Sequence, residues 1–103
     1  MTGKYTCELC GQEARPDTLE NHPIVPGEII EQAGVQGPGT VKLCVNCRRE
    51  LDRWYSKKVS SMTYDESRRG FREKTPPEMV REYETAYRLF ARYKQGLKIG
   101  RRA

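Results

Sequence analysis

The C-terminal third of the chain carries its clearest hydrophobic pattern. Apolar and aromatic residues recur there three or four positions apart, as they do on one face of an α-helix. They are Met79, Val80, Tyr83, Ala86, Tyr87, Phe90, Tyr93 and Leu97. Thr75 and Glu78 have the spacing of a capping box, and Pro76 suits the first helical position. We predict a helix from Pro76 to about Gly96, whose apolar stripe packs against the domain or a partner, and a mobile basic tail over residues 98–103.

Shorter patterns fill the N-terminal half. Residues 18–26 favour an extended chain, because Pro23 keeps His22 away from helical geometry. Residues 27–33 suit one or two helical turns, which the following glycines end. Residues 40–43 favour a second short strand. The sequence thus predicts two strands with a short helix between them.

A further helix is predicted over residues 48–58, a stretch that contains neither Gly nor Pro. Leu51, Trp54 and Tyr55 have the spacing of a single helical face. We expect this face to be buried.

The stretch between the two predicted helices is polar. Within residues 59–74 we predict a short helix over about 64–69, which Gly70 interrupts. The predicted organisation is therefore a core over residues 1–58, a basic connector over 59–74, and an amphipathic helix with a basic tail over 75–103.

Composition limits the size of the core. The chain has 103 residues and only 36% of them are hydrophobic, so apolar burial needs help from another stabilising element. The opening residues MTGKYT hold no apolar run, and no later segment approaches the ~20 apolar residues that span a bilayer. We therefore expect a cytoplasmic protein with no membrane partner.

Four cysteines supply that stabilising element. They form two Cys-x-x-Cys pairs, Cys7 with Cys10 and Cys44 with Cys47. In a reducing compartment such pairs indicate a metal site rather than disulfides, and four thiolates are the ligand set that tetrahedral Zn²⁺ prefers. We predict one structural zinc ion held by all four cysteines.

Charge is distributed unevenly along the chain. Residues 1–47 hold three basic and six acidic side chains, whereas residues 48–103 hold sixteen basic and eight acidic ones. Such a basic half favours a polyanionic partner, most simply nucleic acid, although a solvated surface has the same composition. The candidate nucleic-acid-binding residues follow the last cysteine: Arg48, Arg49, Arg53, Lys57 and Lys58.

Three motifs in register carry a resemblance to a known family. They are CELCG at the first cysteine pair, LENHPIVP around the only histidine, and LCVNCRRELD at the second pair. In this order and spacing they resemble the HNH (His-Me finger) endonucleases, over about residues 5–55. The resemblance implies an α+β fold, a small zinc-bound treble-clef or ββα core, here followed by C-terminal helices.

The resemblance also assigns roles to residues. In that family two short strands and a helix surround a catalytic divalent ion, and paired cysteines hold a separate structural zinc. By resemblance His22 falls on the general base that deprotonates the attacking water. Asn21 and Asp52 fall on ligands of the catalytic ion, as does Arg48, and an active member would use Mg²⁺ or Mn²⁺ there.

Two of these positions depart from the family pattern. Neutral Asn21 and cationic Arg48 make poor cation ligands, and only Asp52 remains a good one. We therefore favour an HNH-like, zinc-binding protein that binds nucleic acid, with DNA preferred over RNA and with endonuclease activity lost or weakened.

Two other functions stay open. One is an active, divalent-metal-dependent HNH endonuclease that uses His22 as its general base. The other is a zinc-scaffolded protein-interaction module, in which the stripe of the C-terminal helix contacts a protein partner or a second copy in a homodimer.

Overall fold

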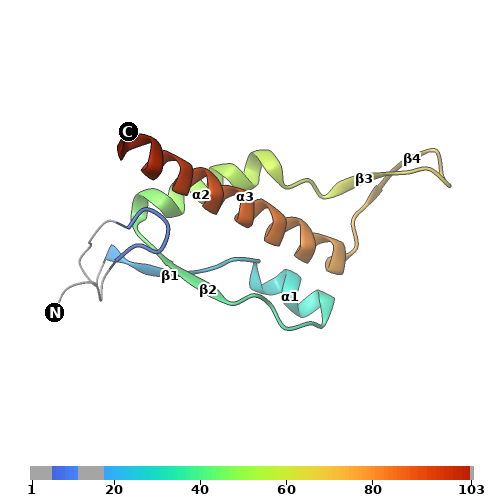
Figure 1. Cartoon of the computed structure of the whole chain (residues 1–103). Coiled ribbons are helices and arrows are strands. Elements are labelled where there is room, and N and C mark those ends of the chain that lie inside the picture. Colours follow the sequence, from blue (N-terminus) through green and yellow to red (C-terminus); the bar gives the residue numbers. More distant parts are fainter. Residues whose placement is uncertain (1–5, 12–17, 103) are drawn as a thin grey trace.

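The computed structural model describes the backbone of residues 6–11 and 18–102, and the side chains of these ranges up to residue 96. The side chain of Leu97 and the end of the predicted tail at residue 103 lie outside this description. Within it the chain is α+β, as predicted, with two separate two-stranded antiparallel sheets and three helices (Figure 1).

The first sheet and the first helix follow the sequence pattern. Strand β1 (Glu20–Pro23) pairs with β2 (Thr40–Leu43), so that His22 lies opposite Val41. Helix α1 (Gly27–Ala33) lies between them in the chain and ends at Gly34, which has a φ of 67°. A left-handed residue of this kind is a common helix terminator, and glycine adopts it without strain. The predicted strand over 40–43 and the helical turns over 27–33 are confirmed.

Helix α2 (Val45–Lys58) begins three residues earlier than predicted. Cys44 is its N-cap, and the Cys44 Sγ accepts a hydrogen bond from the Cys47 backbone N–H at 3.5 Å. Sulfur is a weak acceptor that capping preferences do not favour, so the pattern placed the start too late. As a result, the second cysteine pair spans the first turn of α2.

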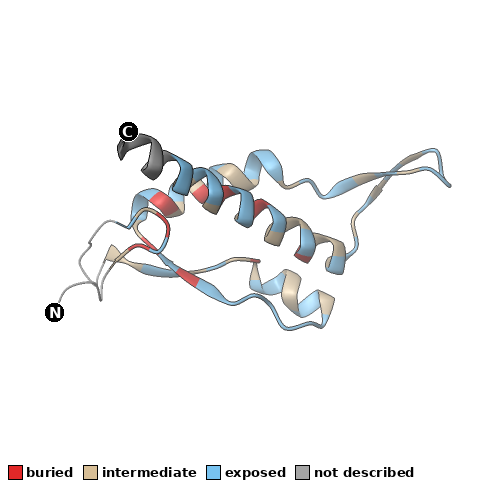
Figure 2. Cartoon of the chain, in the orientation of Figure 1, coloured by how far each residue is buried: buried red, intermediate tan, exposed pale blue. Residues whose placement is uncertain are grey.

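A β-hairpin replaces the predicted short helix over residues 64–69. Strands β3 (Met62–Asp65) and β4 (Gly70–Glu73) pair antiparallel. The Asp65 carboxylate accepts hydrogen bonds from the Ser67 N–H at 3.0 Å and the Ser67 hydroxyl at 2.7 Å, which favours a turn over a helix. The hairpin protrudes from the body of the molecule and contains no buried residue (Figure 2).

Helix α3 (Pro76–Arg102) starts as predicted. Glu78 accepts the Thr75 N–H at 2.8 Å, and the Thr75 hydroxyl accepts the Glu78 N–H at 3.4 Å, which completes the capping box. The predicted end near Gly96 is wrong, because the helix continues to Arg102. A single glycine inside a helix costs only ~1 kcal/mol, so it need not end one.

The core lies where α2, α3 and the cysteine-bearing segments meet (Figure 2). Its largest side chains are Leu43, Leu51 and Phe90, each 0–1% exposed. The Trp54 and Phe90 rings lie 5.4 Å apart between α2 and α3, and the Trp54 Nε1–H donates to the Ala86 carbonyl at 2.9 Å. The apolar stripe of α3 therefore packs, at least in part, inside its own chain.

Candidate metal centre and nucleic-acid interface

The first cysteine pair lies in a tight turn. The Gly11 N–H donates to the Cys7 carbonyl at 3.0 Å, and Gly11 has a φ of 74°, a conformation open to glycine. Glu8 fixes the turn to β2: its N–H donates to the Lys42 carbonyl at 3.0 Å, and its carboxylate accepts the Lys42 N–H at 2.8 Å. These bonds bring Cys10 towards the start of α2.

The two cysteine pairs converge. All four sulfur atoms of Cys7, Cys10, Cys44 and Cys47 lie within 4.8 Å of one another, and the Cys10 and Cys44 sulfurs are 3.9 Å apart. Ligands about 2.3 Å from a tetrahedral ion are ~3.8 Å from each other, whereas disulfide sulfurs are bonded at about 2.05 Å. The four cysteines thus form a potential metal-binding site whose spacing fits a tetrahedral ion.

The electrostatics of this site also favour a cation. Burial opposes ionisation of Cys7, but backbone N–H groups of Cys10, Cys44 and Leu9 donate to it and lower its pKa to about 7. Burial raises the pKa of Cys47, and the neighbouring Cys7 raises it further. Four thiolates this close repel one another, so a divalent cation among them would relieve the repulsion.

His22 and Asp52 lie together in a shallow groove of about 510 Å³. The His22 Nε2 is 3.6 Å from the Asp52 Oδ1, and their side chains are 20% and 54% exposed. Tyr55 and Tyr83 line the same groove, with their rings edge to face at 4.8 Å. Burial raises the pKa of Tyr55, whose hydroxyl donates to the Ile24 carbonyl at 2.7 Å.

The other positions assigned to a catalytic ion do not join this pair. Asn21 is exposed and precedes His22 on a strand, where successive side chains point to opposite faces. Arg48 forms an ion pair with Glu20. Within residues 6–11 and 18–96, the four cysteines are the only cluster of three or more His, Cys, Asp or Glu side chains suited to a metal. The groove therefore offers two ligand side chains, His22 and Asp52.

The predicted nucleic-acid-binding residues fall into two groups. Arg49, Arg53 and Lys57 are exposed, and none of them forms an ion pair within the described part of the chain. Arg48 is half-buried and paired, while the Lys58 Nζ lies 5.2 Å from the centre of the Trp54 ring. The first group leaves three uncompensated cations on the outside of α2.

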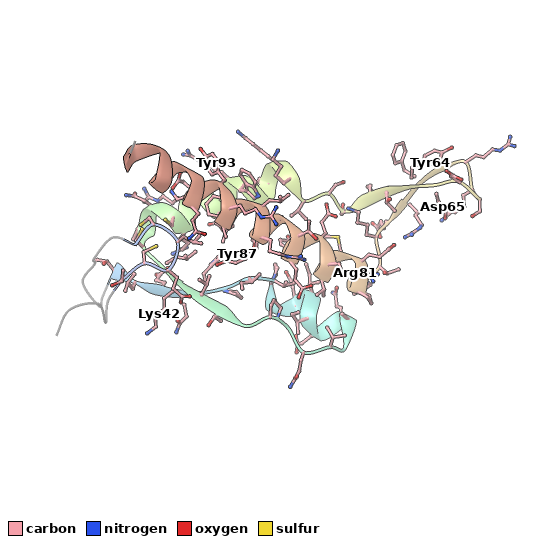
Figure 3. All side chains as sticks on the ribbon, viewed as in Figure 1. Lys42, Tyr64, Asp65, Arg81, Tyr87 and Tyr93 are labelled. Atoms are coloured by element: carbon pink, nitrogen blue, oxygen red, sulfur yellow. The ribbon has the colours of Figure 1, made fainter. Side chains whose placement is uncertain are left out.

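A ring pair beside these cations was not predicted. Trp54 and Tyr93 stack with ring centres 5.6 Å apart and planes inclined by 24°. The helical spacing of both residues predicts packing surfaces, yet Tyr93 is 48% exposed. Figure 3 shows Tyr93 on α3 beside α2, well away from Tyr64 on the hairpin. The only sequence signal for this feature is the presence of aromatic residues among basic ones.

No helix in the described part of the chain is both long and apolar enough to cross a bilayer. No family model matches the chain, and searches of the curated proteins and of the solved structures give no match either.

Proposed function

We propose that this chain is a zinc-stabilised nucleic-acid-binding domain whose contact surface is the exposed face of α2. One observation carries the proposal. Arg49, Arg53 and Lys57 are spaced four residues apart, so they form a row along one side of the helix, and all three are free of ion pairs within the described residues. A row of uncompensated cations on a rigid helix is suited to consecutive phosphates.

The metal centre would hold the first turn of α2 in a fixed position. The second cysteine pair occupies the first turn of α2, and its N-cap is Cys44. A zinc ion held by the four thiolates would fix the start of the helix to the Cys7–Cys10 turn and to β2. Zn²⁺ is the metal we propose, because a closed set of four thiolates is typical of structural zinc sites. No catalytic role is assigned to it.

The order of elements supports an HNH-like interpretation of the core. A cysteine turn, the β1–β2 pair and the cysteine-capped helix α2 succeed one another, and His22 on β1 faces Asp52 on α2 at 3.6 Å. We propose that cleavage is lost or weakened, since a histidine acting as base leaves Asp52 alone to hold an ion. Divalent ions in hydrolytic sites need several oxygen or imidazole ligands.

The binding proposal is tested by fluorescence anisotropy with labelled DNA and RNA over a range of salt concentrations. We expect micromolar affinity that falls steeply with salt, because phosphate contacts release counterions. The double variant Arg49→Glu and Arg53→Glu should weaken binding and lower the slope of log affinity against log salt by about 2, one unit per lost contact.

Arg81→Glu is the matched control. Arg81 is also an exposed cation without an ion pair in the described residues, but it lies on α3 (Figure 3). There it lines a hollow together with Glu78 and Glu82. Its reversal should leave affinity nearly unchanged. Arg81→Glu changes the net charge by half as much as the α2 double variant. A loss of log affinity that is also about half as large would reduce the effect to net charge and contradict the proposed surface. Absence of binding at low salt would contradict the function itself.

The contact between His22 and Asp52 favours a second candidate, a divalent-metal-dependent endonuclease. Here His22 would take a proton from water, and Asp52 with bound solvent would hold Mg²⁺ or Mn²⁺. Incubation with supercoiled plasmid separates the two functions. Nicking that needs the divalent ion and disappears in His22→Ala would establish the enzyme. If the parent and His22→Ala nick the plasmid no more than buffer does, the protein only binds nucleic acid and does not cleave it.

A further inference from the structure

A groove of about 420 Å³ lies between α2 and α3, away from the His22 groove. Its floor contains the stacked rings of Trp54 and Tyr93, and Phe90 lies beneath them with its ring centre 5.4 Å from that of Trp54. The Trp54 Nε1–H is held by the Ala86 carbonyl at 2.9 Å, which fixes the orientation of the indole. The ring pair is therefore positioned before any ligand arrives.

The rim of this groove is basic. Arg53, Lys57 and Lys58 line it, all exposed and without an ion-pair partner among the described residues. The one acidic residue in the lining, Glu50, accepts a hydrogen bond from the Lys94 Nζ at 2.6 Å, so its charge is already balanced. The groove thus combines an exposed aromatic surface with uncompensated positive charge.

This combination selects a ligand with a flat ring system and nearby negative charge. The exposed part of Tyr93 would be of little use to a duplex, because duplex bases are stacked on one another and present only their edges. An unpaired nucleotide offers a free base face for the rings and a phosphate on either side for the cations. An arginine or lysine near the rings also adds a cation–π contact.

We propose that the α2–α3 groove binds single-stranded nucleic acid, with an unpaired base stacked on the exposed part of Tyr93, whose ring in turn stacks on Trp54, and with the flanking phosphates held by Arg53, Lys57 and Lys58. This inference rests on the proposed function, since it names the form of nucleic acid that the basic face of α2 takes. Base stacking tolerates any sequence, so the groove discriminates by strand state rather than by base identity.

The test compares single strands with a duplex of the same sequence, using oligomers of about ten nucleotides in DNA and RNA versions. Trp54 is the only tryptophan of the chain and stacks on Tyr93, so its emission reports a base bound at that neighbouring ring. We expect both single strands to quench Trp54, and the duplex to bind with little quenching. A preference between DNA and RNA single strands would identify the natural form and support the proposal equally.

Variants of Tyr93 test the ring itself. Tyr93→Leu keeps an apolar side chain but removes the flat surface, and should weaken single-strand binding about tenfold while duplex affinity stays the same. Tyr93→Phe should restore the single-strand preference. Leu89→Ala, at a 47% exposed position one helical turn earlier and outside the groove, controls for altered packing of α3. Thermal melts of each variant verify that it is folded.

The outcomes separate the two proposals. If duplex and single strands bind equally well and Tyr93→Leu has no effect, the stacking groove is contradicted, whereas binding by the basic face of α2 is still supported. No binding of any nucleic acid at low salt would overturn both. Single-strand binding that weakens in Tyr93→Leu and recovers in Tyr93→Phe would support both.

Discussion

Replacement of Cys47 by serine tests whether the metal centre and α3 fold as a single unit. Cys47 is 1% exposed and shares one core cluster with Leu51 of α2 and Phe90 of α3. Once the cysteine cluster opens, Phe90 loses part of the surface on which it packs. We therefore expect Cys47→Ser to unfold α3 together with the cysteine-bearing segments.

The size of the effect follows from two contributions. Structural zinc supplies an apparent ~10–16 kcal/mol in small zinc domains, whereas the whole unfolding free energy of a natural domain is about 5–15 kcal/mol. Loss of the proposed zinc ion would therefore be enough to unfold the protein. Phe90→Ala leaves the four ligands in place and should cost only about 3–5 kcal/mol, which lowers stability while leaving a folded population.

Far-UV circular dichroism distinguishes the possible results. Helix α3 has 27 residues, against 7 in α1 and 14 in α2, so a surviving α3 would keep more than half of the helical signal. We expect less than half to remain in Cys47→Ser. The emission of Trp54, which contacts Phe90 across the two helices, should shift to the red at the same time.

Val45→Ser is the matched control, because Val45 is 42% exposed in the same first turn of α2 and is no ligand. This variant should keep both the helical signal and one bound zinc per chain by metal analysis. A Cys47→Ser protein that retains more than half of the helical signal and melts cooperatively would refute the coupling between the metal centre and α3.

Three further predictions follow from single contacts. Hydrogen bonds from Arg72 hold the pKa of Glu78 at about 2, below its ordinary value of 4.5, so their stabilisation is present above about pH 4.5 and is lost as the pH falls through 2. Glu78→Gln should therefore make the melting temperature less dependent on pH over that range. A melting temperature that falls with pH as steeply as in the parent would contradict this. Tyr55→Phe removes the hydrogen bond to the Ile24 carbonyl and should lower the unfolding free energy in urea by about 1–3 kcal/mol; no loss would show that water replaces the hydroxyl. Phe71→Ser removes the edge-to-face contact of the Phe71 ring with Tyr64 across the hairpin and should lower stability by no more than about 1 kcal/mol, because Phe71 is 70% exposed. A larger loss would reveal that the hairpin packs on the rest of the domain.

Features set by neighbouring residues were predictable from the sequence. The capping box of Thr75 and Glu78 and the turn between Cys7 and Cys10 depend on residues three apart, so spacing alone determines them. The hairpin at 62–73 is not predicted because each of its strands has only four residues, and because the Asp65 side chain that closes its turn is equally common in loops and at helix starts. Periodicity could not separate these possibilities.

Features set by tertiary packing were not predictable. The stacking of Trp54 on Tyr93 joins residues from two helices, and it depends on how α2 and α3 cross. The contact between His22 and Asp52 likewise depends on the angle between β1 and α2. For these residues the sequence supplied a residue type and a family analogy, and only the three-dimensional arrangement brought the partners together.

The protruding β3–β4 hairpin connects α2 to α3 without contributing to the core. Arg68 and Arg69 at its tip are exposed, which makes the tip a natural site for tryptic cleavage. After such a cut, the Trp54–Phe90 contact and the Lys94–Glu50 ion pair should keep the two fragments together. The domain is therefore suited to expression as two separate halves that reassemble, with the cysteine-bearing piece serving as the template on which α3 docks.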